Sequence, residues 1–351
     1  MKTVINLKSD VYYQGIYWND YPEVRAYMCK NFTGDANKWW VEDFKERYAK
    51  KPFNHALFLN CGDGRWERDF IDKGIVKKVT AFDISPDLIA IAKKNRGRRK
   101  IKYLIADANK INFPKNQFDL VVNYAALHHT QYINRICKIL ADSIKSNGYL
   151  VNFEYIGPHR NQYPILQWLL AKYVNAQLPE FCQQDMKYPH LPTMLVSDPT
   201  EAIHSELIMK CVRRYFTVVE KRDTGGGIAY LLLTHNQKMK NTSKSIQRKY
   251  INKILEYDHK LTYHKLVPNL FSYFILKPKK IALDKKTIRK FKKEEFLRES
   301  LSAKRRGVYS FFDYLKLIIN SKSTFERLYL LIRYPYLINS VYIFRKITGF
   351  Y

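Results

Sequence analysis

The sequence has few cysteines and no long hydrophobic run. Its five cysteines, among 351 residues, form no Cys-x-x-Cys pair and no disulfide-like framework, which fits a reducing cytosol. Residues 1–8 lack the hydrophobic core of a signal peptide, and no apolar run approaches the roughly 20 residues that a membrane span needs. We therefore expect a cytoplasmic protein that is neither secreted by that route nor membrane-spanning.

Acidic residues are also scarce. The chain has 32 Asp and Glu against 61 Lys and Arg, a formal net charge of +29, and 46% hydrophobic residues, enough for a sizeable core. The charge is uneven, because residues 236–351 hold 27 Lys and Arg against 8 Asp and Glu. Such an excess favours an anionic partner or surface. The alternative is a lysine-rich proteome, which would raise the charge along the whole chain rather than at one end.

Residues 56–83 predict a strand, a glycine turn, a helix and a second strand that ends in a carboxylate. Gly62 and Gly64 allow a sharp turn and the close approach of a ligand. The helix after Gly64 would direct its unpaired N–H groups toward that ligand. Asp83 follows Gly64 by 19 residues, about the interval at which an acid meets a ribose diol. This order predicts a nucleoside site; the alternative is a βαβ unit with ordinary turn glycines.

Glu67 argues against a dinucleotide at this site. The dinucleotide fingerprint has a third glycine at that position, and a carboxylate there would add negative charge near a pyrophosphate. S-adenosylmethionine (SAM) has no phosphate and tolerates an acid nearby. Glu67 is therefore more compatible with SAM than with a dinucleotide.

A series of motifs resembles those of class I SAM-dependent methyltransferases. The motifs are Leu59–Gly64, Phe82–Ser85, Ile105–Ala108, Phe118–Val122 and Leu127–His129. The resemblance covers about residues 15–235. Two later pieces, Glu154–Pro158 and Asp198–Glu206, resemble a bacterial subfamily found among polysaccharide-biosynthesis enzymes. The chain departs from the family pattern at Asn60, where the family has its first motif glycine, and at Phe58, where it has an acid.

The core predicts alternating strands and helices, and hence an α/β, Rossmann-like, doubly wound and mostly parallel sheet with an antiparallel last strand. Strands are expected near 56–60, 78–83, 101–105, 118–123 and 148–154, and helices near 65–73, 86–95, 133–145, 165–177 and 198–214. A closing hairpin is expected from Tyr215–Glu220 and Ile228–Thr234, joined through Gly225–Gly227. In such a sheet, ligands lie beyond the carboxyl ends of the strands.

Three parts are expected along the chain. Residues 1–50 would form an aromatic-rich helical cap, and residues 51–235 the methyltransferase domain, with 155–197 as a substrate lid. Residues 236–351 would form a basic, aromatic-rich helical extension, beginning with a polar linker over 236–248.

The end of the extension predicts two amphipathic helices. Apolar residues recur at helical spacing over 308–319, and Ser323–Glu326 forms a capping box. Basic helices of this kind suit an anionic membrane surface. Packing on the catalytic domain or on a second subunit is the main alternative, and nucleic-acid binding is the third.

The resemblance implies a cofactor site at the tips of the first four strands. Asp83 would bind both ribose hydroxyls and Asp107 the adenine amino group, whereas Asn123 and Ala125 would line the methionine moiety. The expected cofactor-binding set is Asn60, Cys61, Gly62, Gly64, Asp83, Ile84, Asp107, Ala108 and Asn123. The structural alternatives are a helix cap for Asp83 and a turn aspartate for Asp107.

Two further residues are expected to perform the chemistry. His128 follows the fourth strand and Glu154 ends the fifth, so they face one pocket if these strands are neighbours. We expect His128 to act as general base, with Glu154 orienting it or the acceptor; a structural hydrogen bond is the alternative for each. Further candidates for acceptor binding are His129, His159, Arg160 and Glu201. No metal site is expected at His128–His129, because adjacent residues rarely converge on one ion and no third ligand is spaced nearby.

These observations favour a SAM-dependent O-methyltransferase that acts on a saccharide or glycoconjugate in cell-surface polysaccharide biosynthesis. Its basic end would hold it on the inner face of the cytoplasmic membrane. An RNA methyltransferase and a catalytically weak SAM-fold binding module are the alternatives, and Asn60 and Phe58 keep the latter open. The sequence leaves the acceptor atom and the oligomeric state undetermined.

Overall fold

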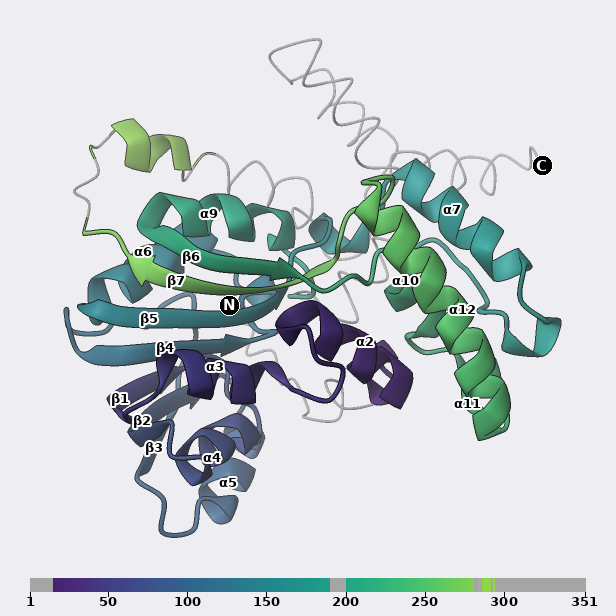
Figure 1. Cartoon of the computed structure of the whole chain (residues 1–351). Coiled ribbons are helices and arrows are strands. Elements are labelled where there is room, and N and C mark those ends of the chain that lie inside the picture. Colours follow the sequence, from purple (N-terminus) through teal and green to yellow (C-terminus); the bar gives the residue numbers. More distant parts are fainter. Residues whose placement is uncertain (1–14, 190–199, 281–283, 285, 292, 294–351) are drawn as a thin grey trace.

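The computed structural model describes residues 15–189, 200–280, 284, 286–291 and 293 (Figure 1). Within them, seven strands form one sheet in the order β3-β2-β1-β4-β5-β7-β6. The strands are β1 (Phe53–Phe58), β2 (Val76–Asp83), β3 (Ile101–Ile105), β4 (Phe118–Tyr124), β5 (Ile144–Tyr155), β6 (Phe216–Asp223) and β7 (Phe271–Pro278). Strand β7 is antiparallel to β5 and β6, and the pairs among β1 to β5 are parallel. The predicted mostly parallel sheet is confirmed, and its one antiparallel strand among the described residues is β7.

Helices cover both faces of the sheet (Figure 1). The first face packs against α3 (Trp40–Tyr48), α4 (Arg65–Asp72) and α5 (Pro86–Asn95), and the second against α6 (Ile133–Ser143) and α9 (Ile208–Tyr215). Alternation along each strand divides the core between the faces. In β1, Ala56 and Phe58 belong to the first core, whereas Leu57 belongs to the second. Phe58 therefore packs in the first core, where its ring meets Phe70 of α4 edge to face at 5.1 Å.

A second group of helices lies beyond the carboxyl ends of the parallel strands (Figure 1). Its members are α2 (Pro22–Thr33), α7 (Ile165–Ala176), α10 (Ala229–Leu233), α11 (Gln237–Lys240) and α12 (Lys244–Tyr263). Helices α2 and α3 lie within residues 1–50, which the sequence predicts to be helical, and Pro22 occupies the first turn of α2, where its fixed φ suits a helix start. Their role as a cap stays a prediction.

A buried aspartate joins this helical group together. Asp258 of α12 accepts backbone N–H bonds from Gly226, Ile228 and Ala229 at 2.7–2.9 Å. It also accepts the hydroxyl proton of Tyr27, on α2, at 2.9 Å. The glycine turn approaches so closely that a Cβ on Gly225 would lie 2.5 Å from the Asp258 carboxylate. One carboxylate therefore connects α2, the turn after β6 and α12.

The structure corrects three predictions near the C-terminal end of the sheet. Ile228–Thr234, expected as the last strand, contains α10 instead, because Asp258 binds the N–H groups at the start of that helix. The strand in that place is β7, beyond the predicted boundary at residue 235. Residues 236–248, expected as a linker, contain α11 and the start of α12. The helix expected from residue 198 begins at Ile208, after a turn and a short 3-10 helix.

Several predictions fall outside the described residues. They include the start of the N-terminal cap, residues 190–197 of the expected lid, the first two residues of the helix expected over 198–214, and the amphipathic segments 308–319 and 323–326. Among the described residues, no helix is both long and apolar enough to cross a membrane.

Candidate active site

The glycine turn after β1 is bound to the carboxylate that ends β2. Gly62 donates its N–H to Oδ2 of Asp83 at 2.9 Å, and Ser85 donates its N–H to Oδ1 at 2.9 Å. Burial raises the pKa of Asp83, and these N–H groups partly oppose that effect. A carboxylate oxygen has two acceptor positions, so Asp83 can accept further donors beside these two. Asp83 thus lies against the glycine turn, and its contact with ribose hydroxyls stays a prediction.

Asn60 occupies the position at which the family has a glycine. Its φ of 41° lies in the left-handed region, which asparagine tolerates better than most other residues. The side chain donates from Nδ2 to the carbonyl oxygen of Ala126 at 3.2 Å. Asn60 therefore keeps the turn and also joins it to the loop after β4.

Exposed apolar side chains and a turn aspartate lie at the ends of β2 and β3. Ile84 follows Asp83, Ile105 is the register partner of Asp83 on β3, and both are more than half exposed. Ile84 belongs to the predicted cofactor-binding set. Ile105 does not, although an exposed apolar residue at the end of a strand is a signal for such a position. Asp107 accepts the N–H of Asn109 at 2.8 Å and so forms a local turn, and Ala108 beside it is buried.

Glu154, on β5, is buried and accepts several hydrogen bonds from β4 and the loop after it. Its Oε2 accepts from Asn123 Nδ2 at 2.7 Å and from the N–H of Leu127 at 2.7 Å, and a further bond comes from Ala126. Its Oε1 lies 2.5 Å from Nδ1 of His128. Burial alone would raise the pKa of Glu154, but the adjacent His128 and the donors hold it below its usual value. Asn123 is fully buried and its amide points at Glu154.

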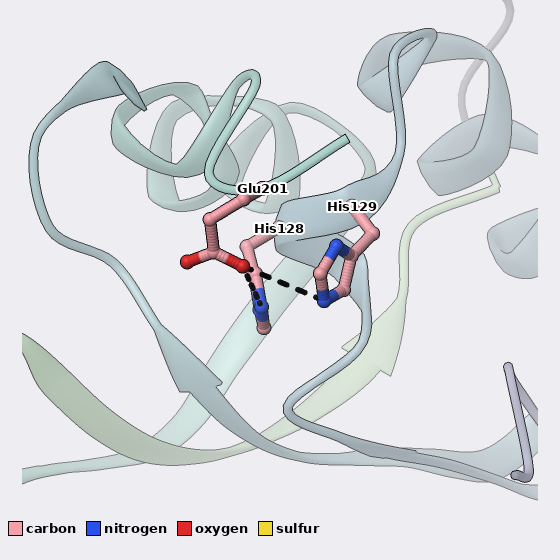
Figure 2. A group of neighbouring side chains, drawn as sticks. All are labelled: His128, His129 and Glu201. Carbon is pink, nitrogen blue, oxygen red and sulfur yellow. Dashed lines mark ion pairs between the residues drawn. The ribbon is translucent and has the colours of Figure 1, made fainter. Parts of the chain in front are cut away.

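His128, His129 and Glu201 form a polar cluster beyond the carboxyl ends of β4 and β5 (Figure 2). The two rings lie 4.1 Å apart, on the short 3-10 helix η2 (Leu127–His129). Oε2 of Glu201 lies 3.7 Å from Nε2 of His128 and 3.8 Å from Nε2 of His129. No third ligand lies near the histidine pair in the sequence, but the fold brings Glu201 to it from a turn about 70 residues further along the chain.

Other predicted residues hold that turn in place. The buried His159 bonds through Nδ1 to the carbonyl of Ile203 at 2.6 Å, and the buried Arg160 donates to the carbonyl of Glu201 at 3.2 Å. The N–H of Ile203 in turn donates to the carbonyl of His128 at 3.1 Å. These contacts give His159 and Arg160 a positioning role for Glu201; direct acceptor binding by them stays a prediction.

Two residues near the site were missed as functional candidates. Thr200 lies with Oγ1 at 3.2 Å from Nδ1 of His129. Glu67, considered only as a replaced glycine, is buried in the first turn of α4, and burial raises its pKa to about 8. Its carboxylate has no hydrogen-bond partner among the described residues. Neither position has a local sequence signal, since both depend on neighbours brought in by the fold.

Comparisons with known proteins identify the central segment. Residues 57–152 match the family described as "Methyltransferase domain". A demethylmenaquinone methyltransferase of Leptospira interrogans is 26% identical over 130 residues, which are 36% of this chain and 51% of that protein. One from Alkalihalophilus pseudofirmus is 23% identical over 205 residues, or 56% of this chain and 84% of that protein. The chain spans about half the length of the Leptospira relatives that it matches.

A solved structure of an S-adenosylmethionine dependent methyltransferase from Mesorhizobium loti is also similar. The match covers 68% of this chain and 96% of that chain, with a TM-score of 0.42 and 15% sequence identity.

The matched family segment runs from β1 into β5 and contains the glycine turn, Asp83 and His128. Residues 57–152 therefore match a methyltransferase domain, in agreement with the family that the motifs resemble. The relatives described above are named for demethylmenaquinone and not for a saccharide.

Proposed function

We propose that this protein is a SAM-dependent methyltransferase that methylates a hydroxyl group of a saccharide or glycoconjugate. One observation supports it most directly: the buried Glu154 binds Nδ1 of His128 at the carboxyl end of β4. The bond from Asn60 to Ala126 places this pair beside the glycine turn. A nucleoside-binding turn and an oriented histidine therefore adjoin each other at the edge of the sheet where ligands bind in such folds.

The residues at the strand tips fit SAM. Asp83 has acceptor capacity for ribose hydroxyls in addition to its two backbone donors. The exposed Ile84 and Ile105 offer an apolar surface for a flat base. Bound SAM supplies an electrophilic methyl group on a sulfonium, so the protein has to position the acceptor and exclude water.

A hydroxyl acceptor must also lose its proton. In the proposed tautomer, Nδ1–H of His128 donates a hydrogen bond to the Glu154 carboxylate, so the basic Nε2 faces Glu201 and the acceptor side. His128 would accept the hydroxyl proton at Nε2, while Glu154 stabilises the imidazolium that forms. The segment 155–197 would act as the lid over this site, and His129 and Glu201 would bind further polar groups of the acceptor.

The test uses the full-length chain. Calorimetry should show binding of SAM and S-adenosylhomocysteine but not of NAD, and a radiolabelled methyl group should pass to saccharide acceptors. His128→Ala should lower kcat by about 100-fold or more, the usual scale for a general base, with little change in SAM affinity. His259→Ala, on the exposed side of α12, is the matched control. Binding of NAD without SAM would refute the cofactor assignment, and an unchanged turnover in His128→Ala would remove His128 from the mechanism.

A quinol or other flat phenolic acceptor is the second candidate. Beside the relatives' names, aromatic rings next to His128 favour it. The ring of Tyr155 lies 5.9 Å from that of His128 and 5.9 Å from that of Tyr230, and Phe271 contacts both tyrosines. Methyl transfer to a water-soluble demethylmenaquinol analogue, with none to saccharides, would favour this acceptor.

The basic end of the chain enters the same proposal as a peripheral attachment to an anionic membrane surface. It is supported by sequence composition alone, since residues 294–351 lie outside the described part. Truncation after about residue 300 should reduce binding to anionic liposomes. Unchanged liposome binding would contradict the attachment, and salt-sensitive RNA binding by the full chain would favour an RNA substrate instead.

A further inference from the structure

We propose that His128, His129 and Glu201 form a binding site for one divalent first-row transition-metal ion of the Zn²⁺ type. Each residue offers one ligand atom, and the three atoms lie within 4.8 Å of one another. They converge on a common point from η2 and from the turn that contains Glu201 (Figure 2).

The distances suit a metal ion. Imidazole nitrogens and carboxylate oxygens bind Zn²⁺ at about 2.0–2.2 Å, which places pairs of ligands about 3.0–3.5 Å apart. Oε2 of Glu201 lies 3.7 Å from Nε2 of His128 and 3.8 Å from Nε2 of His129. These two distances exceed the metal-bound range by a few tenths of an ångström, and the third pair of ligand atoms lies within 4.8 Å, so side-chain rotations of the histidines would bring all three ligands onto one ion.

Outer contacts orient all three ligands in the way that metal sites need. Histidine ligands usually give their second ring nitrogen to a carboxylate or another oxygen, which fixes the ring and its tautomer. His128 Nδ1 meets Glu154, and His129 Nδ1 meets Thr200 Oγ1. The other carboxylate oxygen of Glu201 accepts from Asn161 Nδ2 at 3.3 Å.

The backbone makes this arrangement rigid. Glu154 is held by N–H groups of Ala126 and Leu127, the residues just before His128. The turn with Glu201 is bound to η2 through the N–H of Ile203 and the carbonyl of His128. A pair of adjacent histidines therefore faces the same carboxylate without needing an external partner to bring them together.

The ligand set also selects the metal. Two imidazoles and one carboxylate suit zinc, iron, cobalt or nickel, whereas magnesium and calcium prefer oxygen ligands. Three protein ligands leave coordination positions open to a further group, as in catalytic zinc sites.

If the proposed function holds, the open coordination positions of the ion can bind the acceptor. Metal binding itself does not depend on the proposed function. The acceptor's hydroxyl would bind the ion, which lowers the pKa of the hydroxyl. The O–H bond breaks and its proton passes to water. The oxygen electron pair then forms the bond to the methyl carbon while the C–S bond of the sulfonium breaks. In this state His128 is a metal ligand instead of the base.

The test is a titration of the metal-free, full-length protein with Co²⁺ followed by visible absorption, together with calorimetry of Zn²⁺ and Mg²⁺. We expect one Co²⁺ or Zn²⁺ per chain, and no saturable Mg²⁺ binding. His129→Ala and Glu201→Gln should each weaken binding at least tenfold, and Thr200→Val should weaken it about tenfold as an outer contact. His259→Ala serves as the control, and circular dichroism checks that each variant is folded.

Absence of Co²⁺ absorption in the native protein would overturn the proposal. Binding that is unchanged in folded His129→Ala and Glu201→Gln would overturn it too. SAM calorimetry on the same preparation separates the two hypotheses. A chain that binds SAM but no Co²⁺ refutes the metal site alone, and one that binds Co²⁺ but no SAM refutes the proposed function alone.

Discussion

The side-chain amide of Asn60 donates a hydrogen bond to the carbonyl oxygen of Ala126 at 3.2 Å. This bond joins the glycine turn of the proposed cofactor site to the loop that carries His128. The family glycine at this position would supply the same backbone bend but no side chain. The departure from the motif therefore couples the two halves of the candidate site.

This relationship predicts different outcomes for two substitutions of Asn60. Asn60→Gly should lower the free energy of unfolding by about 1 kcal/mol, because it loses the hydrogen bond and keeps the bend. Asn60→Ala should cost about 1–2 kcal/mol more, because alanine disfavours the φ of 41°. Urea denaturation of both variants measures the difference. Equal stabilities would show that the left-handed backbone is not a constraint here.

Substitution of Asp83 tests the ribose contact. Asp83→Asn should weaken SAM binding by about 10- to 100-fold, the value of about 1.5–3 kcal/mol for a charged hydrogen bond. Calorimetry of SAM provides the measurement. Asp87→Asn, an exposed change in the first turn of α5, is the control and should bind SAM normally. A normal affinity in Asp83→Asn would contradict the assignment of Asp83 to the sugar.

Substitution of Glu154 should damage both stability and chemistry. In Glu154→Gln the side-chain NH₂ must point either at the N–H donors of Asn123, Ala126 and Leu127 or at His128. In each case a buried donor faces another donor instead of an acceptor. We expect a loss of roughly 3 kcal/mol of stability, measured by urea denaturation, and a lower kcat. The exposed Glu256→Gln on α12 should change neither. A stable Glu154→Gln variant with full activity would show that the hydrogen bonds of the Glu154 carboxylate are dispensable.

Glu67 predicts a pH-dependent stability. Because its pKa is raised to about 8 in the fold, the folded state keeps the proton that the unfolded state loses near pH 4.5. Stability therefore falls as the pH rises from about 4.5 to about 8. Glu67→Gln should remove this dependence, so its Tm should exceed that of the native protein by at least about 2 °C at pH 8 and by little at pH 4.5. A Tm difference that is the same at both pH values would contradict the assignment.

The Asp258 contacts predict a large structural effect away from the site. Asp258→Asn replaces one acceptor oxygen by an NH₂ that faces backbone donors, and should cost roughly 2–4 kcal/mol. Thermal melting measures it, with the exposed Asp185→Asn as control. If α10 and its turn are held by apolar packing instead, the two variants will melt alike.

Local signals allowed most of the sheet to be predicted from the sequence. Strands β1 to β5 and helices α4 to α6 begin and end within a few residues of the prediction, apart from an earlier start of β5 at Ile144. Apolar runs, glycines and capping residues such as Ser85 act over a few neighbouring positions, so the chain itself encodes them. The hydrogen bond between Gly62 and Asp83 forms within one local strand–turn–helix–strand segment, so it depends on the same local signals.

The tertiary structure alone decided the last strand and the polar cluster. Strand β7 joins the sheet only after α10, α11 and α12. The start of α10 depends on Asp258, about 30 residues later in the chain. Glu201 and Thr200 reach the two histidines in the same way. Sequence spacing carries information about contacts within one element, whereas these contacts form only when distant elements pack and bury their polar groups together. For that reason the sequence determined the glycine turn, and the packed fold determined what surrounds His128.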